Sequence, residues 1–491
     1  MRRTVLLGVV TAVGLALGAG AAMRSTAALE PAPVKVQQAP AFMDHAPQIA
    51  PLLGFSLPIF QTDQLPNGLR IIVVQDRRFP LVTIHVTLRA GASRLTPATA
   101  GLARAEAALL SAGTDTRSAP EIAAALAAMG GTMSFGADQD FLYVNARALN
   151  SSAQPLLELV SDLVLHPAFP AAAVAREQTE LRLAVAARRA RAPAVARATF
   201  HRLLFGANPY AITGATAASI PQITRAALVA FHQKYFLPNN QATIVIVGDI
   251  PAARAHNLVQ QYFGDWRLGI PLPPPSPAVS NPSTPQLVLI ERPGAAASTI
   301  LAGNVGLTRT ASSYLAFRIA LQVLEERMDR RLVHSSDAAY RDLGAWTLST
   351  HVPTPATAAA LRQILAQLGR LRTAPPSAQE LIRAKNYLTG AYMIGLQTQS
   401  DLARAMLSQA IYGLPSSWLA NYVDNLHSVT AADALSAAQA VIQPKHLVIV
   451  ITGDVHRIEP SLAQALAGQK MTILNEAGDT IGTYGGASKQ P

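Results

Sequence analysis

The chain has 491 residues, 40 Lys and Arg against 29 Asp and Glu, a formal charge of +11 and no cysteine. This length accommodates two domains of ordinary size, and the absence of cysteine excludes disulfides and a cysteine-linked lipid anchor. Only six of the basic residues are Lys, and the arginines are scattered through alanine-rich segments without a zinc-finger, helix-turn-helix or RNA-binding signature. The scattered arginines and the missing signatures argue against nucleic-acid binding. The net positive charge indicates a solvated positive surface, or one that meets an acidic partner or an anionic membrane.

The first 21 residues have the three parts of a secretory signal peptide. Arg2 and Arg3 precede an apolar run over residues 5–19, and the small residues at 19–21 form a cleavage site. The run is too short for a membrane span, so we expect a periplasmic protein without integral membrane contact after signal removal. The two arginines leave Sec and twin-arginine export both open. Residues 22–55, rich in Pro and Ala, are predicted to be a flexible leader.

Two β-rich runs open the predicted first domain. Residues 69–74 follow a Pro-Asn-Gly turn signal at 66–68, and a second β-branched run covers residues 82–90, with Pro80 between the two. Such runs bounded by turn residues predict two strands.

A helix is predicted over residues 101–112, where Leu102, Ala105, Leu109 and Ala112 recur at helical spacing. The segment has the frame of H-x-x-E-H, the inverted zinc-protease motif. In that motif two imidazoles one turn apart hold Zn²⁺, and the glutamate activates the bound water.

Every functional position of this frame carries another residue. Arg104, Ala107 and Ala108 occupy it, and helical spacing predicts that they lie together on a face different from the apolar stripe. Alanine cannot bind a metal, and the guanidinium of Arg104 is a fixed cation that repels one. The helix therefore predicts neither a metal ligand nor a catalytic residue.

The zinc site is not rebuilt elsewhere in the sequence. Eleven histidines are present and no two lie within four residues of each other, so no helix carries an imidazole pair. The sequence also lacks a Ser-His-Asp order, a phosphate-binding loop and a dinucleotide fingerprint.

An internal repeat divides the chain. Residues 223–250 and 429–455 share a Thr start, an Ala-rich helix, a Pro turn, a β-branched strand and a final Gly-Asp, and their Pro238 and Pro444 lie 206 residues apart. Each half begins with β runs, which in the second half start near 286 and 298.

We therefore predict an α+β protein of two homologous domains of about 200 residues each. A proline-dense stiff linker separates them. The predicted boundaries are a first domain at 56–267, the linker at 268–284, a second domain at 285–465 and a C-terminal tail at 466–491.

The order of these signals resembles the pitrilysin or insulinase family of zinc peptidases, also called M16. The resemblance rests on the Pro-Asn-Gly-Leu turn, the β pair, the Gly-Leu-Ala helix ending in Gly113-Thr114, and a helix start at 116–122 with Ser118 as N-cap and Pro120 in the first turn. It implies two α/β-sandwich domains, and it covers roughly residues 60–465.

The resemblance also implies a third zinc ligand, a glutamate on a later helix. Its expected place is near residues 184–186, where no acid is present. Glu177 and Glu180 are the nearest acids, and we expect them on a solvated helix face.

Family members further use an Arg and a Tyr, separated by six residues, to hold the substrate backbone. Trp346 stands where the Tyr is usual, and Ala339 stands seven residues before it, so the spacing is absent. Tyr340 and Arg341 are the candidates for a remodelled pair, and Trp346 is a candidate for stacking on a peptide.

Together these features predict a non-catalytic M16-like subunit. It would pair with a zinc-bearing M16 peptidase, complete a chamber that degrades or processes peptides, and hold no cofactor itself, the zinc being in the partner. Two alternatives remain open: a stand-alone peptide-binding or chaperone-like module, and an active zinc endopeptidase that uses unrecognised ligands.

Overall fold

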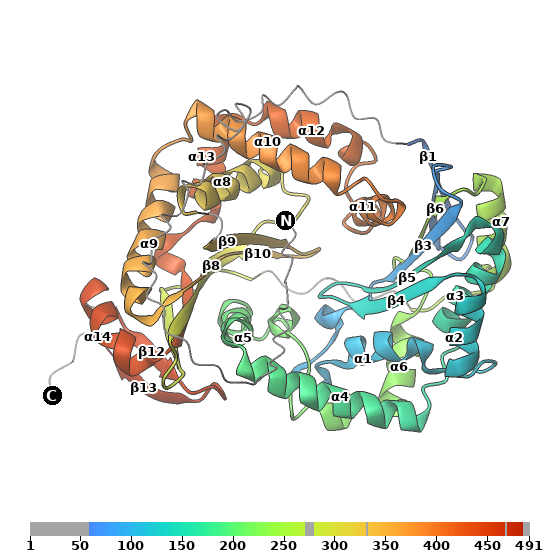
Figure 1. Ribbon diagram of the computed structural model, residues 1–491, viewed down its shortest axis with the longest axis horizontal. Coiled ribbons are helices and arrows are strands. Elements are labelled where there is room, and N and C mark those ends of the chain that lie inside the picture. The colour runs from blue at the N-terminus through green and yellow to red at the C-terminus, as the bar shows by residue number, and fades with distance from the viewer. Residues whose placement is uncertain (1–57, 271–278, 330–331, 467–468, 485–491) are drawn as a thin grey trace, which may run out of the picture. The chain divides into compact units, whose positions relative to one another are not determined.

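The computed structural model describes residues 58–270, 279–329, 332–466 and 469–484. The predicted signal peptide and leader lie outside the described residues, as does the middle of the predicted linker. Two mixed β-sheets with helices layered on them confirm the α+β expectation (Figure 1). No helix among the described residues is long and apolar enough to cross a membrane.

The first sheet has six strands in the order β1-β2-β6-β3-β5-β4. β2 and β6 run parallel, and the other neighbours are antiparallel. Alternate residues of β3, namely Val82, Ile84, Val86 and Leu88, point into the main core because side chains of a strand alternate between faces. The bounds are β1 (Phe60–Gln64), β2 (Arg70–Gln75), β3 (Leu81–Leu88), β4 (Thr132–Ala137), β5 (Leu142–Leu149) and β6 (Thr243–Gly248).

One face of this sheet is covered by helices of the same half. α1, α2, α3 and α7 pack on the strands, and α4 and α6 pack on α1. Ser118 caps α2 in a capping box with Glu121, and Pro120 lies in its first turn, which confirms the predicted helix start. The bounds are α1 (Leu102–Leu109), α2 (Ala119–Ala128), α3 (Ala153–Leu165), α4 (Ala171–Ala190), α6 (Arg225–Tyr235) and α7 (Ala252–Phe263).

The second sheet has seven strands in the order β13-β12-β7-β11-β8-β10-β9. Its central pair β7 and β11 is parallel, as β2 and β6 are in the first sheet. The bounds are β7 (Gln286–Glu291), β8 (Ala297–Gly306), β9 (Val333–Ala339), β10 (Gly344–Pro353), β11 (Val448–Gly453), β12 (Met471–Leu474) and β13 (Thr480–Tyr484). The helices of this half are α8 (Tyr314–Arg327), α9 (Thr357–Thr373), α10 (Ala378–Ile394), α12 (Trp418–Ser428), α13 (Ala431–Val441) and α14 (Val455–Ala465).

The predicted C-terminal tail at 466–491 is wrong over residues 471–484. β12 pairs in parallel with Leu287–Ile290 of β7, and β13 pairs with β12 as an antiparallel hairpin. The edge of β7 offers unpaired backbone groups, and β12 satisfies them. The second sheet therefore continues about twenty residues beyond the predicted boundary at 465.

The sequence repeat corresponds to one structural unit in each half. In the first half α6 leads to β6, and in the second half α13 leads to β11. Both strands are fully buried and lie inside their sheets. The repeated segment therefore builds the centre of each sheet.

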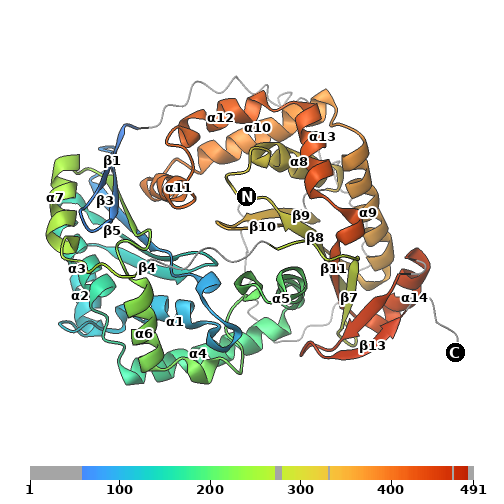
Figure 2. The same cartoon turned by 180° about the vertical axis from the view of Figure 1, so that it is seen from behind.

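Two helices lie on the sheet of the opposite half. α5 (Ala192–Phe205) belongs to the first half but packs on β8 and β11, whereas α11 (Gln399–Ile411) belongs to the second half but packs on β6 and β3. Figures 1 and 2 show α5, in green, beside the second sheet and α11, in orange, on the face of the first sheet away from α1. Each sheet is thus sandwiched between helices of its own half and one helix of the other.

Candidate functional site

The helix that carries the zinc-motif frame is buried on nearly every side. Only Arg104 and Ala108 are exposed along α1, and they lie one turn apart on one face. Gly101 begins the helix with a φ of 94°, and a Cβ at this position would lie 2.5 Å from Ala215 Cβ. A glycine is therefore required where the chain enters α1.

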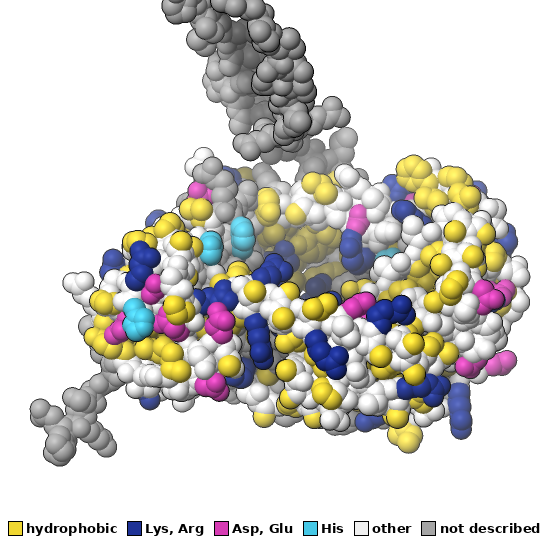
Figure 3. Space-filling view, turned by 60° about the horizontal axis from the view of Figure 1, so that its bottom comes forward, with side chains coloured by type: hydrophobic (Ala, Val, Ile, Leu, Met, Phe, Trp, Pro, Cys, Tyr) yellow, Lys and Arg dark blue, Asp and Glu magenta, His cyan; other side chains and the backbone are white. Residues whose placement is uncertain are grey.

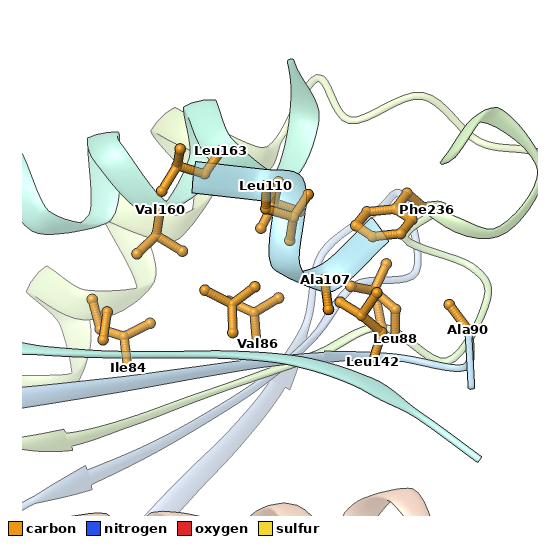
Figure 4. Close-up of a cluster of buried hydrophobic side chains, with 14 of the residues drawn as sticks. Ile84, Val86, Leu88, Ala90, Ala107, Leu110, Leu142, Val160, Leu163 and Phe236 are labelled. Atoms are coloured by element: carbon orange, nitrogen blue, oxygen red, sulfur yellow. The ribbon is translucent and has the colours of Figure 1, made fainter. Parts of the chain in front are cut away.

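Ala107 does not share the exposure of Arg104 and Ala108, although helical spacing puts it beside them. Ala107 is 1% exposed and belongs to the main core of the first half. Figure 4 shows it pointing from α1 toward the sheet, where Leu88 and Leu142 lie. The spacing did not reveal this because α1 is enclosed by the sheet, α4 and α6 together, so most of its circumference is interior.

The residues present do not fit a zinc ion. The frame offers one guanidinium and two methyl groups, and neither kind of group ligates a metal. On α4, residues 184–186 are Ala, Val and Ala, so the implied third ligand is also missing. Among the residues that the structure describes, no three His, Cys, Asp or Glu side chains gather in a way that could hold a metal ion.

The two nearest acids on α4 differ in environment. Glu177 is half-buried and Glu180 is exposed. Burial raises the pKa of Glu177, as does Glu180, while Arg104 lowers it. The cation in the motif frame thus acts on an acid of the helix that was expected to supply the third ligand.

A buried polar pair lies directly behind the motif frame. Glu106, fully buried on α1, has Oε1 at 3.0 Å from Nδ1 of His232 on α6, and its Oε2 has no partner among the residues that the structure describes. Burial raises the pKa of Glu106 well above its usual value and lowers the pKa of His232 to about 4. Burial thus disfavours the charged form of both groups in this hydrogen bond, while the His232 ring stacks on Phe236 at a centroid distance of 4.1 Å.

Sequence reasoning missed this pair because its members are 126 residues apart. One signal was available: an acid in the middle of an apolar helix either lies in a site or needs a buried partner.

The structure brings Tyr340 and Arg341 to the junction of the two halves. Tyr340 is half-buried with its ring 5.1 Å from that of Tyr210, and burial raises its pKa to about 12. The backbone N–H of Arg341 donates to Asp140 Oδ2 at 2.9 Å, and its guanidinium donates to the carbonyl of Ile411. Both residues are thus held by protein contacts across the junction.

The environment of Trp346 differs from that of Tyr340 and Arg341. It lies within β10, is 0% exposed, and packs edge-on against Phe317 at a centroid distance of 6.3 Å. Its Nε1 has no hydrogen-bond partner among the described residues. This buried position leaves no ring surface on which a peptide can stack.

A second set of polar contacts completes the junction. Tyr210 donates its hydroxyl to Asp140, and Arg89 pairs with Asp342 across the two halves. Burial raises the pKa of Asp140 to about 6, although the Tyr210 and Arg341 donors oppose the shift. Asp140 thus accepts hydrogen bonds from Arg341 of the other half and from Tyr210 of the η6 turn (Pro209–Ala211), and Asp342 is paired with Arg89 of the other half.

Basic side chains do not collect into a single patch on the face seen in Figure 3. Lys and Arg are distributed there among apolar and uncharged groups. This face therefore presents no single basic surface.

Two family models match the chain. The insulinase model of peptidase family M16 matches residues 70–216, and the peptidase M16 inactive domain matches residues 222–388. An uncharacterized zinc protease of Mycobacterium tuberculosis is 25% identical over 419 residues, which is 82% of this chain and 94% of that protein. A relative of the same description from Mycobacterium bovis has the same identity and coverage.

Solved structures share the fold. A peptidase M16 inactive domain from Pseudomonas fluorescens superposes with a TM-score of 0.74 at 23% identity, covering 80% of this chain and 98% of that one. A protease from Helicobacter pylori gives a TM-score of 0.74 at 17% identity, covering 81% and 100%. With tandem M16 domains matched over most of its described residues and this fold, the chain belongs to the M16 (pitrilysin or insulinase-like) peptidase family.

Proposed function

We propose that this chain is a non-catalytic M16 subunit that pairs with a zinc-bearing M16 peptidase and forms part of the chamber in which that partner cuts peptides. The observation that carries the proposal is the contrast between an intact fold and an erased centre. Arg104 and Ala108 occupy the only exposed positions of α1, and Ala107 is core. A chamber needs walls from both subunits but only one set of ligands and one general base.

An edge strand supports a role in peptide binding. Among the described strands β4 pairs only with β5 and ends the first sheet, and α1 lies beside it. An extended peptide can add to such an edge through main-chain hydrogen bonds without any metal. This chain would therefore hold peptide while the partner supplies zinc and the hydrolytic step.

The predicted signal peptide supports a periplasmic site of action, where we propose that the partner also resides. Zinc would be held by the partner alone. The active-enzyme alternative would need ligands from outside the described residues or from another chain, since no suitable cluster occurs among those described.

The test is purification of the tagged chain from its native periplasm, followed by identification of bound proteins and a peptide-cleavage assay. We expect an H-x-x-E-H relative in the complex, with cleavage that a zinc chelator abolishes and that replacement of the partner's glutamate removes. The isolated chain should bind zinc only sub-stoichiometrically. A chain that cleaves peptides alone and loses this activity on chelation would refute the proposal.

The stand-alone peptide-binding module is the second candidate. It is favoured by a polar cavity within this chain, described below, which needs no partner to be complete. Recovery of the chain without an M16 partner, together with saturable peptide binding, would establish this candidate in place of the first.

A further inference from the structure

A cavity of about 660 Å³ lies between the first sheet and α11. We call α5 and α11 the exchanged helices, because each packs on the sheet of the opposite half. Its floor is the face of β3, β4 and β5 that points away from the main core, with His85 and Thr87 at the centre. Its wall is one face of α11, where Arg404, Leu407 and Ser408 line it. α11 covers β2 and β6 closely through an apolar cluster, and the cavity remains where that cover ends.

The floor contains buried polar groups without partners. Thr87 is 1% exposed and its Oγ1 has no hydrogen-bond partner among the described residues, and beside it His85 is 6% exposed. An unsatisfied buried hydroxyl costs about 1 to 3 kcal/mol. Such groups call for a ligand or ordered water in the cavity.

Two arginines give the cavity its charge. Arg309 is fixed by hydrogen bonds from Nε to the carbonyl of Ala339 at 3.3 Å and from Nη1 to Ser408 Oγ at 3.2 Å, and its guanidinium lies 4.5 Å from the ring centre of Tyr412. Arg404 approaches from α11 and also pairs with Asp401. Burial lowers the pKa of His85 to about 4, so the imidazole is a neutral partner and adds no third positive charge at neutral pH.

One acid, Asp138, faces the same cavity, and one of its two carboxylate oxygens is engaged in a turn. Asp138 Oδ1 accepts the backbone N–H groups of Asp140 and Phe141, both at 2.8 Å, within the turn between β4 and β5. Its carboxylate offsets part of the charge of Arg309. The donors that remain available are the hydroxyls of Thr87 and Ser400 and the uncommitted N–H groups of the arginines, whereas Asn145 Nδ2 already donates to Ser134 Oγ at 3.4 Å.

The corresponding place in the second half is filled. There the exchanged helix α5 sets Phe200, Leu204 and Phe205 against Val288, Ile290 and Val450, all buried. The two exchanged helices therefore cover their sheets differently: the second cover is apolar and packed, and the first leaves a polar cavity. The polar floor is a feature of the first half and not a requirement of the architecture.

We propose that this cavity binds the C-terminal residue of a peptide, with its carboxylate against Arg309, Arg404 and Thr87 and its apolar side chain against Phe141, Leu407 and Ile411. Cationic and hydroxyl donors recognise a carboxylate, and the apolar side of the lining suits an aliphatic side chain. The volume lies in the range of small-ligand sites. The inference concerns only this chain and stands whether or not the partner peptidase exists.

The test is calorimetric titration of the isolated full chain with acetyl-Ala-Ala-Leu as the free acid, the same peptide as its C-terminal amide, and isovalerate. We expect the acid to bind, the amide to bind at least tenfold more weakly, and isovalerate to bind more weakly than the peptide acid. Equal binding of acid and amide, or no binding of either, would overturn the proposal. Isovalerate binding as tightly as the peptide would overturn the peptide part and identify a small-carboxylate site.

Two variants locate the binding. Thr87→Val should weaken binding of the acid about tenfold, as loss of a hydrogen bond to a charged group does. Thr83→Val is its matched control, because Thr83 is equally buried on the same strand with an unpartnered Oγ1 but does not line the cavity. Arg404→Gln, at a largely exposed side chain, should also weaken binding. Unchanged affinity in both Thr87→Val and Arg404→Gln would exclude this cavity as the site.

Discussion

Arg89 Nη2 lies 2.7 Å from Asp342 Oδ2, and this ion pair connects the end of β3 in the first half to the β9–β10 connection in the second. The two side chains are only 11% and 14% exposed. Each charge therefore depends on the other for compensation.

Removal of one partner should be more harmful than removal of both. We expect Asp342→Asn to lower the free energy of unfolding by about 3 kcal/mol because Arg89 is left buried and unpaired. The double variant Arg89→Met, Asp342→Leu should recover most of that loss. Urea unfolding measures both. The control is Arg77→Gln, which removes the ion pair between the exposed Arg77 Nε and Asp249 Oδ1 at 3.8 Å. It should change the free energy of unfolding by less than about 1 kcal/mol.

The Glu106–His232 pair predicts a dependence of stability on pH. The pKa of Glu106 is raised in the folded chain, so the folded state keeps a proton that the unfolded state loses as pH rises above about 4.3. This group therefore lowers stability with rising pH, until the pKa of the folded state is passed. Glu106→Gln should remove that part of the slope and keep the hydrogen bond to His232. Glu106→Ala should cost about 2 to 4 kcal/mol at pH 7, because it leaves Nδ1 of His232 without its partner beside a cavity. Equal slopes in wild type and Glu106→Gln would contradict the assignment.

His85 predicts the opposite behaviour in acid. Its pKa is lowered by burial to about 4, so as pH falls below about 6.5 the unfolded chain takes up a proton that the folded chain does not. Stability should fall between pH 6.5 and 4, and His85→Gln should reduce that fall by roughly 3 kcal/mol. Denaturant midpoints at several pH values measure this. His456→Gln, on the exposed surface, is the control.

Restoring the zinc motif on α1 should fail for a structural reason. Ala107→Glu buries a carboxyl group among Leu88, Leu142 and Phe236, and we expect a loss of at least about 3 kcal/mol. Ala108→Glu places the same group on the exposed face and should change stability by less than about 0.5 kcal/mol. Thermal unfolding compares the two. The triple variant Arg104→His, Ala107→Glu, Ala108→His should still not bind zinc stoichiometrically, since residues 184–186 supply no third ligand.

The helix exchange predicts that the halves do not fold separately. Residues 58–267 alone would expose Ile72, Val74, Val245 and Val247, which α11 covers in the whole chain. We expect this fragment to aggregate or to bind a hydrophobic dye, and the full chain to unfold in one transition. Phe200→Ala, on the buried face of α5, should cost about 3 to 5 kcal/mol and lower the midpoint of that single transition. A soluble fragment with a cooperative transition of its own would contradict the prediction.

Local features of the fold follow well from the sequence. β-branched runs predicted β2 and β3, and Ser118 with Pro120 predicted the start of α2. These elements are set by neighbours in the chain, so short windows of sequence contain the necessary information. The hairpin of β12 and β13 was missed because β12 is a four-residue strand whose partner β7 lies far upstream.

The candidate site was less accessible to such reasoning. Absence of ligands at Arg104 and Ala108 could be read directly, but the burial of Ala107 depends on how α4 and α6 enclose α1. The same holds for α5 and α11, because an amphipathic helix shows that one face is buried without showing which sheet buries it. Contacts across the junction, such as Asp140 with Arg341, join residues 201 positions apart.

Because α5 and α11 each pack on the sheet of the opposite half, the first sheet cannot be covered until α11 has been synthesised. The last core strand of the first sheet, β6, ends at Gly248, but α11 ends at Ile411, so a ribosome that adds roughly 5 to 20 residues per second needs on the order of ten seconds or more to deliver the cover. A first sheet that folds during that interval presents a bare aliphatic surface, because Ile72, Val74, Val245 and Val247 are still uncovered. The order of the elements therefore requires either a chaperone that binds this surface or a delay of folding until the chain is complete.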